Sequence, residues 1–338
     1  MRVLITGGSG LIGRHLVARL LAEGDRPVVV SRRADALRRD PATREYEVVQ
    51  GDPTVPGRWQ EAVDGCDAVV NLVGHNVFAE RWNAEVKRKI RDSRVLGTDN
   101  VVAAIRDAKV RPRVLVQGSA IGYYGPHGDE ELDETALSGT DFLAVVSREW
   151  EQASEAVEGL GVRRAVVRTG VVLAAGDGAL KVMAPLFKLG PGVPVGGGGL
   201  IAPARGDQWM SWIHLDDIVG LFDLALRDAR AVGPINGVSP HPVRNADFAR
   251  ALSNVLWKPY APWRVFIPLG PPDLLLRIVL GEVADVVAKG QRAVPRRALE
   301  LGYTFRHPDL SEALASIFQP RATTSRGGPA PEAAGAPR

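Results

Sequence analysis

The sequence predicts an α/β protein built on a parallel sheet that is wound with crossover helices. Short β-branched runs alternate with longer helical patterns through roughly the first 170 residues. Each run has the length of one buried strand, and a glycine-rich turn follows the first of them. The runs are Val3–Thr6, Pro27–Ser31, Glu47–Gln50, Ala68–Gly74, Arg113–Ser119 and Arg164–Gly170.

Helical patterns lie between these runs, at Leu11–Glu23, Asn83–Asp107 and Asp141–Glu158. After Gly170 the regularity fades into Gly190–Gln208, whose glycines and prolines predict a flexible loop or lid. The stretch "WMSWIHLDDIVGLFDLAL" then predicts a strand, a turn at Leu215 and Asp216, and a helix with Asp216 or Asp217 near its start.

The chain divides into a large nucleotide-binding part and a small end part. We predict a Rossmann-type, doubly wound domain over residues 1–240, with substrate-side segments from about 175. From Pro259 the pattern changes to helices broken by prolines, which predicts a small, mostly helical C-terminal subdomain over residues 241–320. Residues 321–338 hold no aromatic side chain and no Leu, Ile or Val, so we expect this tail to be disordered.

Composition excludes several classes of protein. With 338 residues, of which 45% are hydrophobic and 24% charged, the chain can bury a large core. Its net charge is only +3 and no basic stripe is present, so nucleic acid is not an expected partner. No run approaches the 18 or so apolar residues of a membrane span. The single cysteine, Cys66, and the absence of a Cys/His cluster at metal-ligand spacing predict a cytoplasmic protein without a metal.

The segment "MRVLITGGSGLIGRHLV" contains a nucleotide-binding pattern. Gly7, Gly10 and Gly13 follow the first strand and open an amphipathic helix, in the spacing Gly-x-x-Gly-x-x-Gly. A tight turn, close approach of backbone to a pyrophosphate and close strand-to-helix packing each need a residue without a side chain. The helix N-terminus then attracts the phosphates. We expect Ser9, Leu11 and Ile12 to contact the cofactor too.

The end of the second strand indicates which dinucleotide binds. Ser31, Arg32 and Arg33 occupy the place where NAD enzymes carry Asp or Glu to hold the ribose 2′-hydroxyl. A guanidinium can instead pair bidentately with a 2′-phosphate, so we predict NADP(H). The alternative is that both arginines are simply solvated.

Three further positions follow neighbouring strands at the same edge of the predicted sheet. Asp52 follows the third strand, and we predict that it contacts the adenine. Leu72 and Gly74 end the fourth strand, where the missing side chain of Gly74 would let backbone approach the cofactor.

These motifs resemble the extended short-chain dehydrogenases/reductases, through "TGGSGLIG", "NLVG", "SAIGYYG" and "WIHLDD". More narrowly, the chain resembles the epimerase family proteins, in which a nucleotide-sugar-epimerase-like domain precedes a C-terminal domain of unknown function. The stretches "RTGVVLAAGDGAL", "QWMSWIHLDDIV" and "GQRAVPRRALELGYTFRHPDLSEAL" carry this closer resemblance. It extends to about Gln319 and implies no particular substrate.

The superfamily uses a Tyr as general acid/base, a Lys four residues later, and a Ser or Thr after the fifth strand. Here the two helix positions fall on Leu143 and Ser147, or on Phe142 and Val146, so the Tyr-x-x-x-Lys relay is absent. The serine position falls on Ser119 or on Ala120, depending on the register.

Two interpretations of "GSAIGYYG" follow from this absence. In one, Ser119 and Tyr123 form a substitute catalytic pair facing the nicotinamide. In the other, Ser119 lines the nicotinamide ribose while Tyr123 or Tyr124 packs the loop.

Other polar residues have mainly structural interpretations. We expect Glu134 and Glu151 to cap or pair on helix surfaces, and His214 to be a structural hydrogen-bonding group. Arg168 ends the sixth strand, where contacts to cofactor or substrate would fall.

The sequence therefore predicts an NADP(H)-dependent oxidoreductase or epimerase-like enzyme with an unidentified small polar substrate. The alternative is a noncatalytic NADP(H)-binding redox sensor or regulatory protein. The two long helices resemble those that pair in the dimers of many relatives, and their charged faces leave a monomer or a homodimer open.

Overall fold

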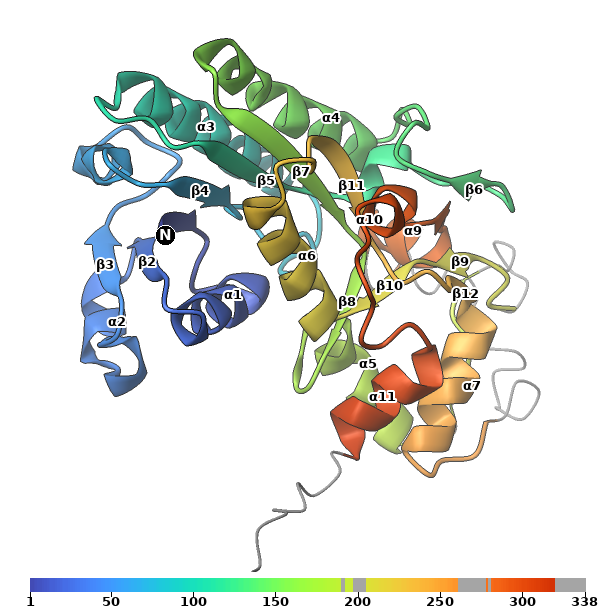
Figure 1. Cartoon of the computed structure of the whole chain (residues 1–338). Coiled ribbons are helices and arrows are strands. Elements are labelled where there is room, and N and C mark those ends of the chain that lie inside the picture. The colour runs from blue at the N-terminus through green and yellow to red at the C-terminus, as the bar shows by residue number, and fades with distance from the viewer. Residues whose placement is uncertain (190–191, 197–204, 261–277, 279–280, 320–338) are drawn as a thin grey trace, which may run out of the picture.

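The computed structural model describes residues 1–189, 192–196, 205–260, 278 and 281–319 (Figure 1). Its centre is a seven-stranded, entirely parallel sheet in the order β11-β7-β5-β4-β1-β2-β3. This confirms the predicted doubly wound parallel sheet. The strands are β1 (Arg2–Thr6), β2 (Arg26–Ser31), β3 (Glu47–Gln50), β4 (Ala68–Asn71), β5 (Val114–Ala120), β7 (Arg163–Thr169) and β11 (Gly233–Gly237).

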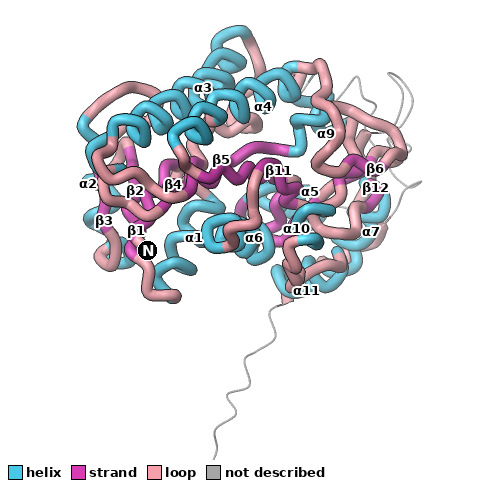
Figure 2. The backbone as a smooth tube through the Cα atoms, turned by 45° about the horizontal axis from the view of Figure 1, so that its top comes forward, coloured by secondary structure: helices cyan, strands magenta, loops and turns pink. Residues whose placement is uncertain are grey.

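Helices cover both faces of this sheet. In Figure 2, α3 and α4 lie above the strands, while α1 and α6 lie below them. A short helix, α2 (Ala34–Arg39), packs beside β3 at the edge. The four helices named on the two faces are α1 (Leu11–Ala22), α3 (Ala84–Asp107), α4 (Phe142–Ala153) and α6 (Leu215–Arg227).

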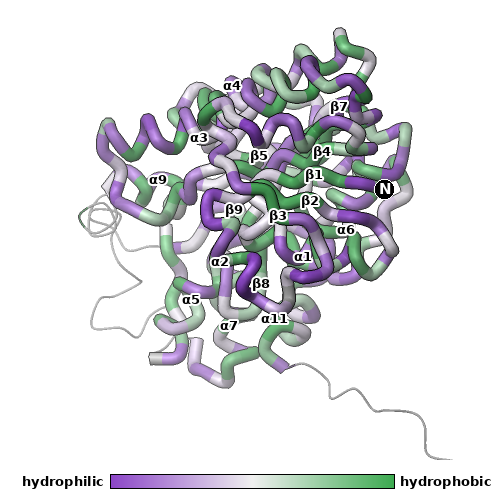
Figure 3. The backbone as a smooth tube through the Cα atoms, turned by 90° about the vertical axis from the view of Figure 1, so that its left-hand side faces the viewer, coloured by the Kyte–Doolittle hydropathy of each residue, from purple (hydrophilic) through white to green (hydrophobic). Residues whose placement is uncertain are grey.

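The alternation of side chains along the strands divides the core in two. Val3 and Ile5 of β1 pack into one cluster with the buried residues of α1 and α6. Leu4 between them points to the opposite cluster, which α3 closes with residues such as Ile105. Figure 3 shows the apolar strands β1, β2 and β4 inside the molecule.

A buried row of polar side chains crosses the middle of the sheet. Thr6, Asn71 and Gln117 are register neighbours on β1, β4 and β5. The Thr6 hydroxyl donates to Asn71 Oδ1 at 2.5 Å, and Asn71 Nδ2 donates to Gln117 Oε1 at 2.9 Å. Asn71 Nδ2 also donates to the hydroxyl of Thr98 on α3, at 2.8 Å. These bonds tie three strands and a helix directly beneath the carboxyl edge of the sheet.

One predicted helix ends earlier than expected. The pattern over Asp141–Glu158 predicts one helix, but α4 ends at Ala153 and a 3₁₀ segment, η4 (Glu155–Leu160), follows. The Ser154 hydroxyl donates to the carbonyl of Glu151 at 2.6 Å, and this local bond competes with helix continuation. Gly161, at φ +76°, then turns the chain into β7.

The seventh strand is absent from the sequence prediction. β11 has the sequence Gly-Pro-Ile-Asn-Gly, which carries a single β-branched residue and no alternating pattern. It forms because its backbone pairs with β7 at the sheet edge, with Asn236 opposite Arg168.

Short strand pairs and helices extend the molecule beyond the sheet. The pairs are β8 (Val171–Ala174) with β10 (Trp212–His214), β9 (Trp209–Met210) with β12 (Val243–Arg244), and β6 (Glu131–Leu132) with β13 (Arg292–Ala293). The helices are α5 (Gly178–Leu189), α7 (Asn245–Val255), α9 (Val283–Ala288), α10 (Arg296–Glu300) and α11 (Leu310–Phe318).

The C-terminal part is mostly helical, as predicted. Most of the predicted loop Gly190–Gln208 and the predicted tail 321–338 lie outside the described residues. None of the helices within the described ranges is both long enough and apolar enough to cross a membrane.

Candidate functional site

The glycine turn between β1 and α1 is packed against its own backbone. Gly7 has φ +70°, and its carbonyl accepts the N–H of Gly10 at 2.9 Å. A Cβ on Gly7 would lie 2.6 Å from the Leu72 carbonyl oxygen, and one on Gly13 would collide with the Gly7 carbonyl. Gly8, which sequence reasoning missed, packs equally closely against Val29. Contacts within the protein therefore exclude side chains at these positions, whether or not a ligand binds.

Gly10 is different from its neighbours. It is exposed, and a Cβ there would meet only the Gly7 carbonyl, at 3.2 Å. It is the N-cap of α1 and offers no capping side chain, and the first turn holds no acidic residue. The N–H groups of Leu11 and Ile12 thus have neither an intrahelical nor a capping partner. With Ser9 also exposed, this helix end can accept an anion.

The end of β2 presents two exposed arginines, Arg32 and Arg33. Ser31 is buried, and its hydroxyl oxygen accepts the backbone N–H of Arg33 at 3.1 Å. Gln50 holds the same turn, accepting from Ala34 N–H and donating to the Arg32 carbonyl. The side chains of Arg32 and Arg33 are exposed, and neither guanidinium has a hydrogen-bond or ion-pair partner among the described residues.

Asp52 and Leu72 are each fixed by hydrogen bonds just after a strand ends. One carboxylate oxygen of Asp52, Oδ1, accepts the backbone N–H and the hydroxyl of Thr54, at 3.0 and 2.8 Å. The Leu72 N–H donates to the Thr6 carbonyl at 3.1 Å, which places the residue after β4 beside the glycine turn.

Gly74 faces a cation that sequence reasoning missed. A Cβ on Gly74 would lie 3.2 Å from the guanidinium carbon of Arg94. Arg94 donates to the carbonyls of His75 and Ile90, each at 3.0 Å, and lies 5.0 Å from the Trp150 ring. Burial lowers its pKa to about 10. Arg94 thus holds the loop after β4 in place.

Beyond β5 the polar groups are buried and mutually paired. Ser119, Arg168 and Asn236 are register neighbours across β5, β7 and β11. The Ser119 hydroxyl donates to Glu151 Oε1 of α4 at 2.6 Å. Arg168 grips the same carboxylate with two bonds, of 2.8 and 2.9 Å.

Tyr124 completes this cluster, which we call the Glu151–Arg168 network. Its hydroxyl accepts from Arg168 at 3.0 Å and donates to Asn236 Oδ1 at 2.7 Å. Burial raises the pKa of Tyr124 to about 12, although Arg168 and Asn236 oppose the shift. Burial alone would lower the pKa of Arg168, but Glu151 outweighs it and raises that pKa. The expectation that Glu151 pairs on a helix surface is therefore wrong, because its carboxylate faces inward to the sheet.

Tyr123 lies at the edge of the network. Its ring stacks on the Arg168 guanidinium, 3.6 Å from centroid to carbon, and meets Tyr124 edge-on. The side chain is only half-buried, and its hydroxyl has no hydrogen-bond partner among the described residues. Among the described residues, Tyr123 is thus held through its ring and not through its hydroxyl.

The helix positions expected to hold the Tyr and Lys are occupied by other residues. A Cβ on Gly122, in the 3₁₀ turn η3 (Ile121–Tyr124), would lie 3.5 Å from Leu143 Cβ and 3.9 Å from Ser147 Oγ. Leu143 and Ser147 form one of the two pairs that the sequence places at the Tyr and Lys positions.

Glu134 also differs from its expected place on a helix surface. Its Oε1 accepts the backbone N–H of Asn236 at 2.8 Å and that of Arg297 at 3.1 Å. Burial raises the pKa of Glu134, and the backbone hydrogen bonds oppose the shift. This carboxyl joins the C-terminal segment to the edge strand β11.

The "WIHLDD" stretch fastens the C-terminal segment to α6. α6 already begins at Leu215, where a turn was predicted, and Asp216 and Asp217 lie in its first turn, as expected. His214 is the N-cap, and its Nδ1 accepts the Asp216 N–H at 3.1 Å. Asp217 is fully buried and accepts the backbone N–H groups of Arg306 and His307, at 2.7 and 2.9 Å. The structural interpretation of His214 agrees with this geometry.

The chain matches two known family models, one over the sheet and one over the C-terminal segment. A family model described as "NAD dependent epimerase/dehydratase family" matches residues 3–236. The chain belongs to the NAD-dependent epimerase/dehydratase family. A second model, the domain of unknown function DUF1731, matches residues 271–317.

Curated relatives extend the family match over almost the whole chain. The chain is 40% identical over 322 residues to the chloroplastic epimerase family protein SDR39U1 homolog of Arabidopsis thaliana, covering 94% of this chain and 87% of the relative. It is 31% identical to the epimerase family protein YfhF of Bacillus subtilis, covering 96% and 100%.

Solved structures agree with this membership. A crystal structure of the human epimerase family protein SDR39U1 with NADPH is 32% identical, with a TM-score of 0.80, covering 95% of this chain and 100% of that one. The dTDP-glucose 4,6-dehydratase DesIV of Streptomyces venezuelae, at 20% identity and a TM-score of 0.73, shares the fold. The resemblance to epimerase family proteins with a C-terminal domain of unknown function is thereby confirmed.

Proposed function

We propose that this family member binds NADP(H) in preference to NAD(H) and acts as an oxidoreductase or epimerase-like enzyme. The observation that carries the proposal is the exposed pair Arg32 and Arg33, without a counter-charge among the described residues, at the end of β2. A dinucleotide with a 2′-phosphate supplies the missing negative charge. The NADPH in the human relative supports the same choice.

The residues of the turn fit this cofactor. The backbone of Gly7–Gly13 and the free N–H groups of Leu11 and Ile12 would hold the pyrophosphate. Asp52, Leu72 and Gly74 would line the adenosine side, where backbone can approach closely. When bound, the nicotinamide ring supplies a donor or acceptor of hydride.

Tyr123 is the proposed proton donor of the site. Its hydroxyl is free among the described residues, and its ring is fixed on Arg168. Ser119 acts beside it, with its own proton directed to Glu151. Arg168 stabilises negative charge near both residues but keeps its proton, because its pKa is far above neutrality. The substrate class is a small polar molecule with a carbonyl or hydroxyl group.

The alternative is a noncatalytic NADP(H)-binding sensor or regulator. The observation that favours it is the pair of side chains facing Gly122, because Leu143 and Ser147 provide neither a phenol nor an amine. Under both proposals the protein acts in the cytoplasm, as a monomer or as a homodimer that pairs α3 and α4.

Binding titrations of the purified protein with NADPH and NADH, followed by fluorescence, test the cofactor assignment. We expect wild type to prefer NADPH by about tenfold or more, because charge-assisted hydrogen bonds contribute about 1.5–3 kcal/mol each. Arg32→Ala and Arg33→Ala should weaken NADPH binding and leave NADH binding unchanged. Arg39→Ala, which removes an exposed charge further along α2, is the matched control. Equal affinities for both dinucleotides, or binding of neither, would overturn the assignment.

The two functional candidates are separated by Tyr123→Phe. Screening carbonyl substrates for NADPH oxidation should give turnover in wild type and a loss of about 10²-fold or more in the variant. NADPH binding should not change. Tight NADPH binding without turnover on any carbonyl class would favour the sensor.

A further inference from the structure

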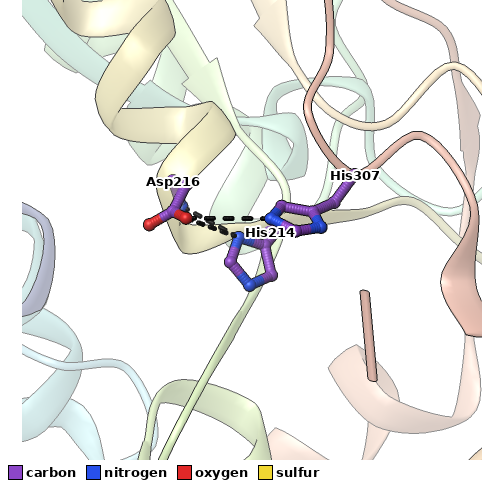
Figure 4. Close-up of side chains that lie close together, drawn as sticks. All are labelled: His214, Asp216 and His307. Carbon is purple, nitrogen blue, oxygen red and sulfur yellow. Dashed lines mark hydrogen bonds and ion pairs between the residues drawn. The ribbon is translucent and has the colours of Figure 1, made fainter. Parts of the chain in front are cut away.

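Two histidines and an aspartate converge where the C-terminal segment meets α6 (Figure 4). His214 Nδ1 lies 3.8 Å from Asp216 Oδ2, and His307 Nε2 lies 3.7 Å from the same oxygen. The two imidazole centroids are 4.0 Å apart. All three donor atoms lie within 4.8 Å of one another, and this is the one such His/Cys/Asp/Glu group in the part of the chain that the structure describes.

The backbone of this group is fixed independently of any ligand. The buried Asp217 carboxylate accepts the N–H groups of both Arg306 and His307, so the main chain that carries His307 cannot shift freely. His214 is buried between β10 and α6. Asp216 is half exposed, and its side chain can rotate toward the two rings. Two of the three donors are thus pre-positioned and the third can adjust.

The hydrogen bonds around His214 determine which ring nitrogen is unprotonated. The Ser316 hydroxyl donates to the Ala313 carbonyl at 2.7 Å, so its oxygen can accept from His214 Nε2, 3.4 Å away. His214 Nδ1 accepts the backbone N–H of Asp216. Both contacts place the proton on Nε2 and the lone pair on Nδ1, the nitrogen that faces Asp216. Metal-binding histidines characteristically donate their second ring N–H to such a partner.

We propose that His214 Nδ1, His307 Nε2 and the Asp216 carboxylate bind one divalent transition-metal ion of the zinc class. Two imidazoles and a carboxylate suit Zn²⁺, and bonds of about 2.0–2.1 Å would bring the donors to about 3.4 Å apart. The two observed nitrogen-to-oxygen distances, 3.8 and 3.7 Å, exceed this by a few tenths of an ångström. Metal binding exchanges the capping bond from Asp216 N–H for a metal bond. The solvent side supplies the remaining ligands as water.

Positive charges near the site would repel a bound cation, and carboxylates nearby offset part of that repulsion. Arg19 and Arg306 line the same hollow as Asp216, and the helix N-terminus also disfavours a cation. Asp223 pairs with Arg19 at 3.0 Å, and the Asp217 carboxylate accepts the backbone N–H of His307 at 2.9 Å. A bound ion would link α6 to the C-terminal segment, so its effect is to fasten this segment rather than to perform chemistry at the nucleotide turn.

The test titrates metal-free, full-length protein with ZnCl₂ alone, by calorimetry and by thermal unfolding. We expect one site per chain and a Tm rise of a few degrees, since an ion that binds only the folded state stabilises it. His307→Ala and Asp216→Asn should each weaken binding at least tenfold. His127→Ala, which removes a half-buried histidine that pairs with Glu130 away from this group, should bind like wild type.

Visible absorption of bound Co²⁺ is a second, independent test of the same site. Co²⁺ bound by two nitrogens and an oxygen in a four-coordinate site should give visible absorption that is absent in His307→Ala. Circular dichroism of that variant distinguishes loss of the ligand from loss of the fold. The absence of a one-to-one site in wild type, or binding that survives His307→Ala, would overturn the proposal.

Discussion

The two halves of the sheet treat charge in opposite ways at their carboxyl ends. At the ends of β1, β2 and β4 the glycine turn presents mainly backbone groups. The two arginines there, Arg32 and Arg33, have no partner among the described residues. Along β5, β7 and β11 the polar groups are buried, and Arg168 is fully paired with Glu151 and Tyr124. Under the proposed function a ligand supplies the counter-charge of Arg32 and Arg33, whereas Arg168 has its counter-charge within the protein.

The largest expected effect comes from breaking the paired half. Glu151→Gln leaves the Arg168 guanidinium buried without its counter-charge, which should reduce the free energy of unfolding by about 3–5 kcal/mol. Urea denaturation measures this loss. The control is Glu158→Gln, whose exposed pair with Arg164 should contribute about 1 kcal/mol or less. A Glu151→Gln protein as stable as the control would show that the network is not a structural unit.

A second prediction compares two adjacent residues of one turn. Tyr124→Phe removes a buried hydroxyl that serves both Arg168 and Asn236, and should cost about 1–3 kcal/mol of unfolding free energy. Tyr123→Phe keeps the ring on Arg168 and removes a hydroxyl without a partner among the described residues, so stability should change by less than about 0.5 kcal/mol. Comparable losses in both variants would contradict the assignment of Tyr123 as the free phenol.

The smallest effect is a pH dependence at Glu134. Burial raises the pKa of this carboxyl above its ordinary value of 4.5, so protonation favours the folded state. Its contribution to stability is fully present below the ordinary pKa and is lost as pH rises through the raised one. Glu134→Gln keeps an oxygen acceptor for the two backbone N–H groups but does not titrate.

The variant should therefore gain stability relative to wild type between pH 4 and pH 7. Unfolding free energies at several pH values measure the difference. Glu61→Gln, at an exposed carboxyl, should show a difference that stays constant. A constant difference for Glu134→Gln as well would mean that this carboxyl is not desolvated.

The unpaired half of the sheet was largely predictable from the sequence, because its features are local. The glycine spacing and the arginines after β2 are read from contiguous residues, and the structure shows the packing that requires Gly7 and Gly13. The crossover helices follow from apolar periodicity. Of the three helices predicted between the first six strands, only α4 ends well before its predicted bound, where the Ser154 hydroxyl bonds to a carbonyl of the helix. The short helix α2 was not predicted.

In the paired half, the strands β5 and β7 were predicted, but the pairing of their polar groups was not predictable, because the partners come from distant segments. Glu151 and Arg168 belong to a helix and a strand whose register only the folded sheet defines. β11 lacks a strand pattern and forms by pairing with β7. The His214, Asp216 and His307 group is likewise assembled from two distant segments, so no spacing in the sequence reveals it.

The central claim is that Arg32 and Arg33 recognise a 2′-phosphate, and fragment binding tests it without the nicotinamide half. Calorimetry should show that adenosine 2′,5′-bisphosphate binds wild type about tenfold or more tightly than adenosine 5′-monophosphate. In the double variant Arg32→Ala/Arg33→Ala this difference should disappear. Equal binding of the two fragments by wild type would contradict the account, because the unpaired arginines would then have no role in choosing the cofactor.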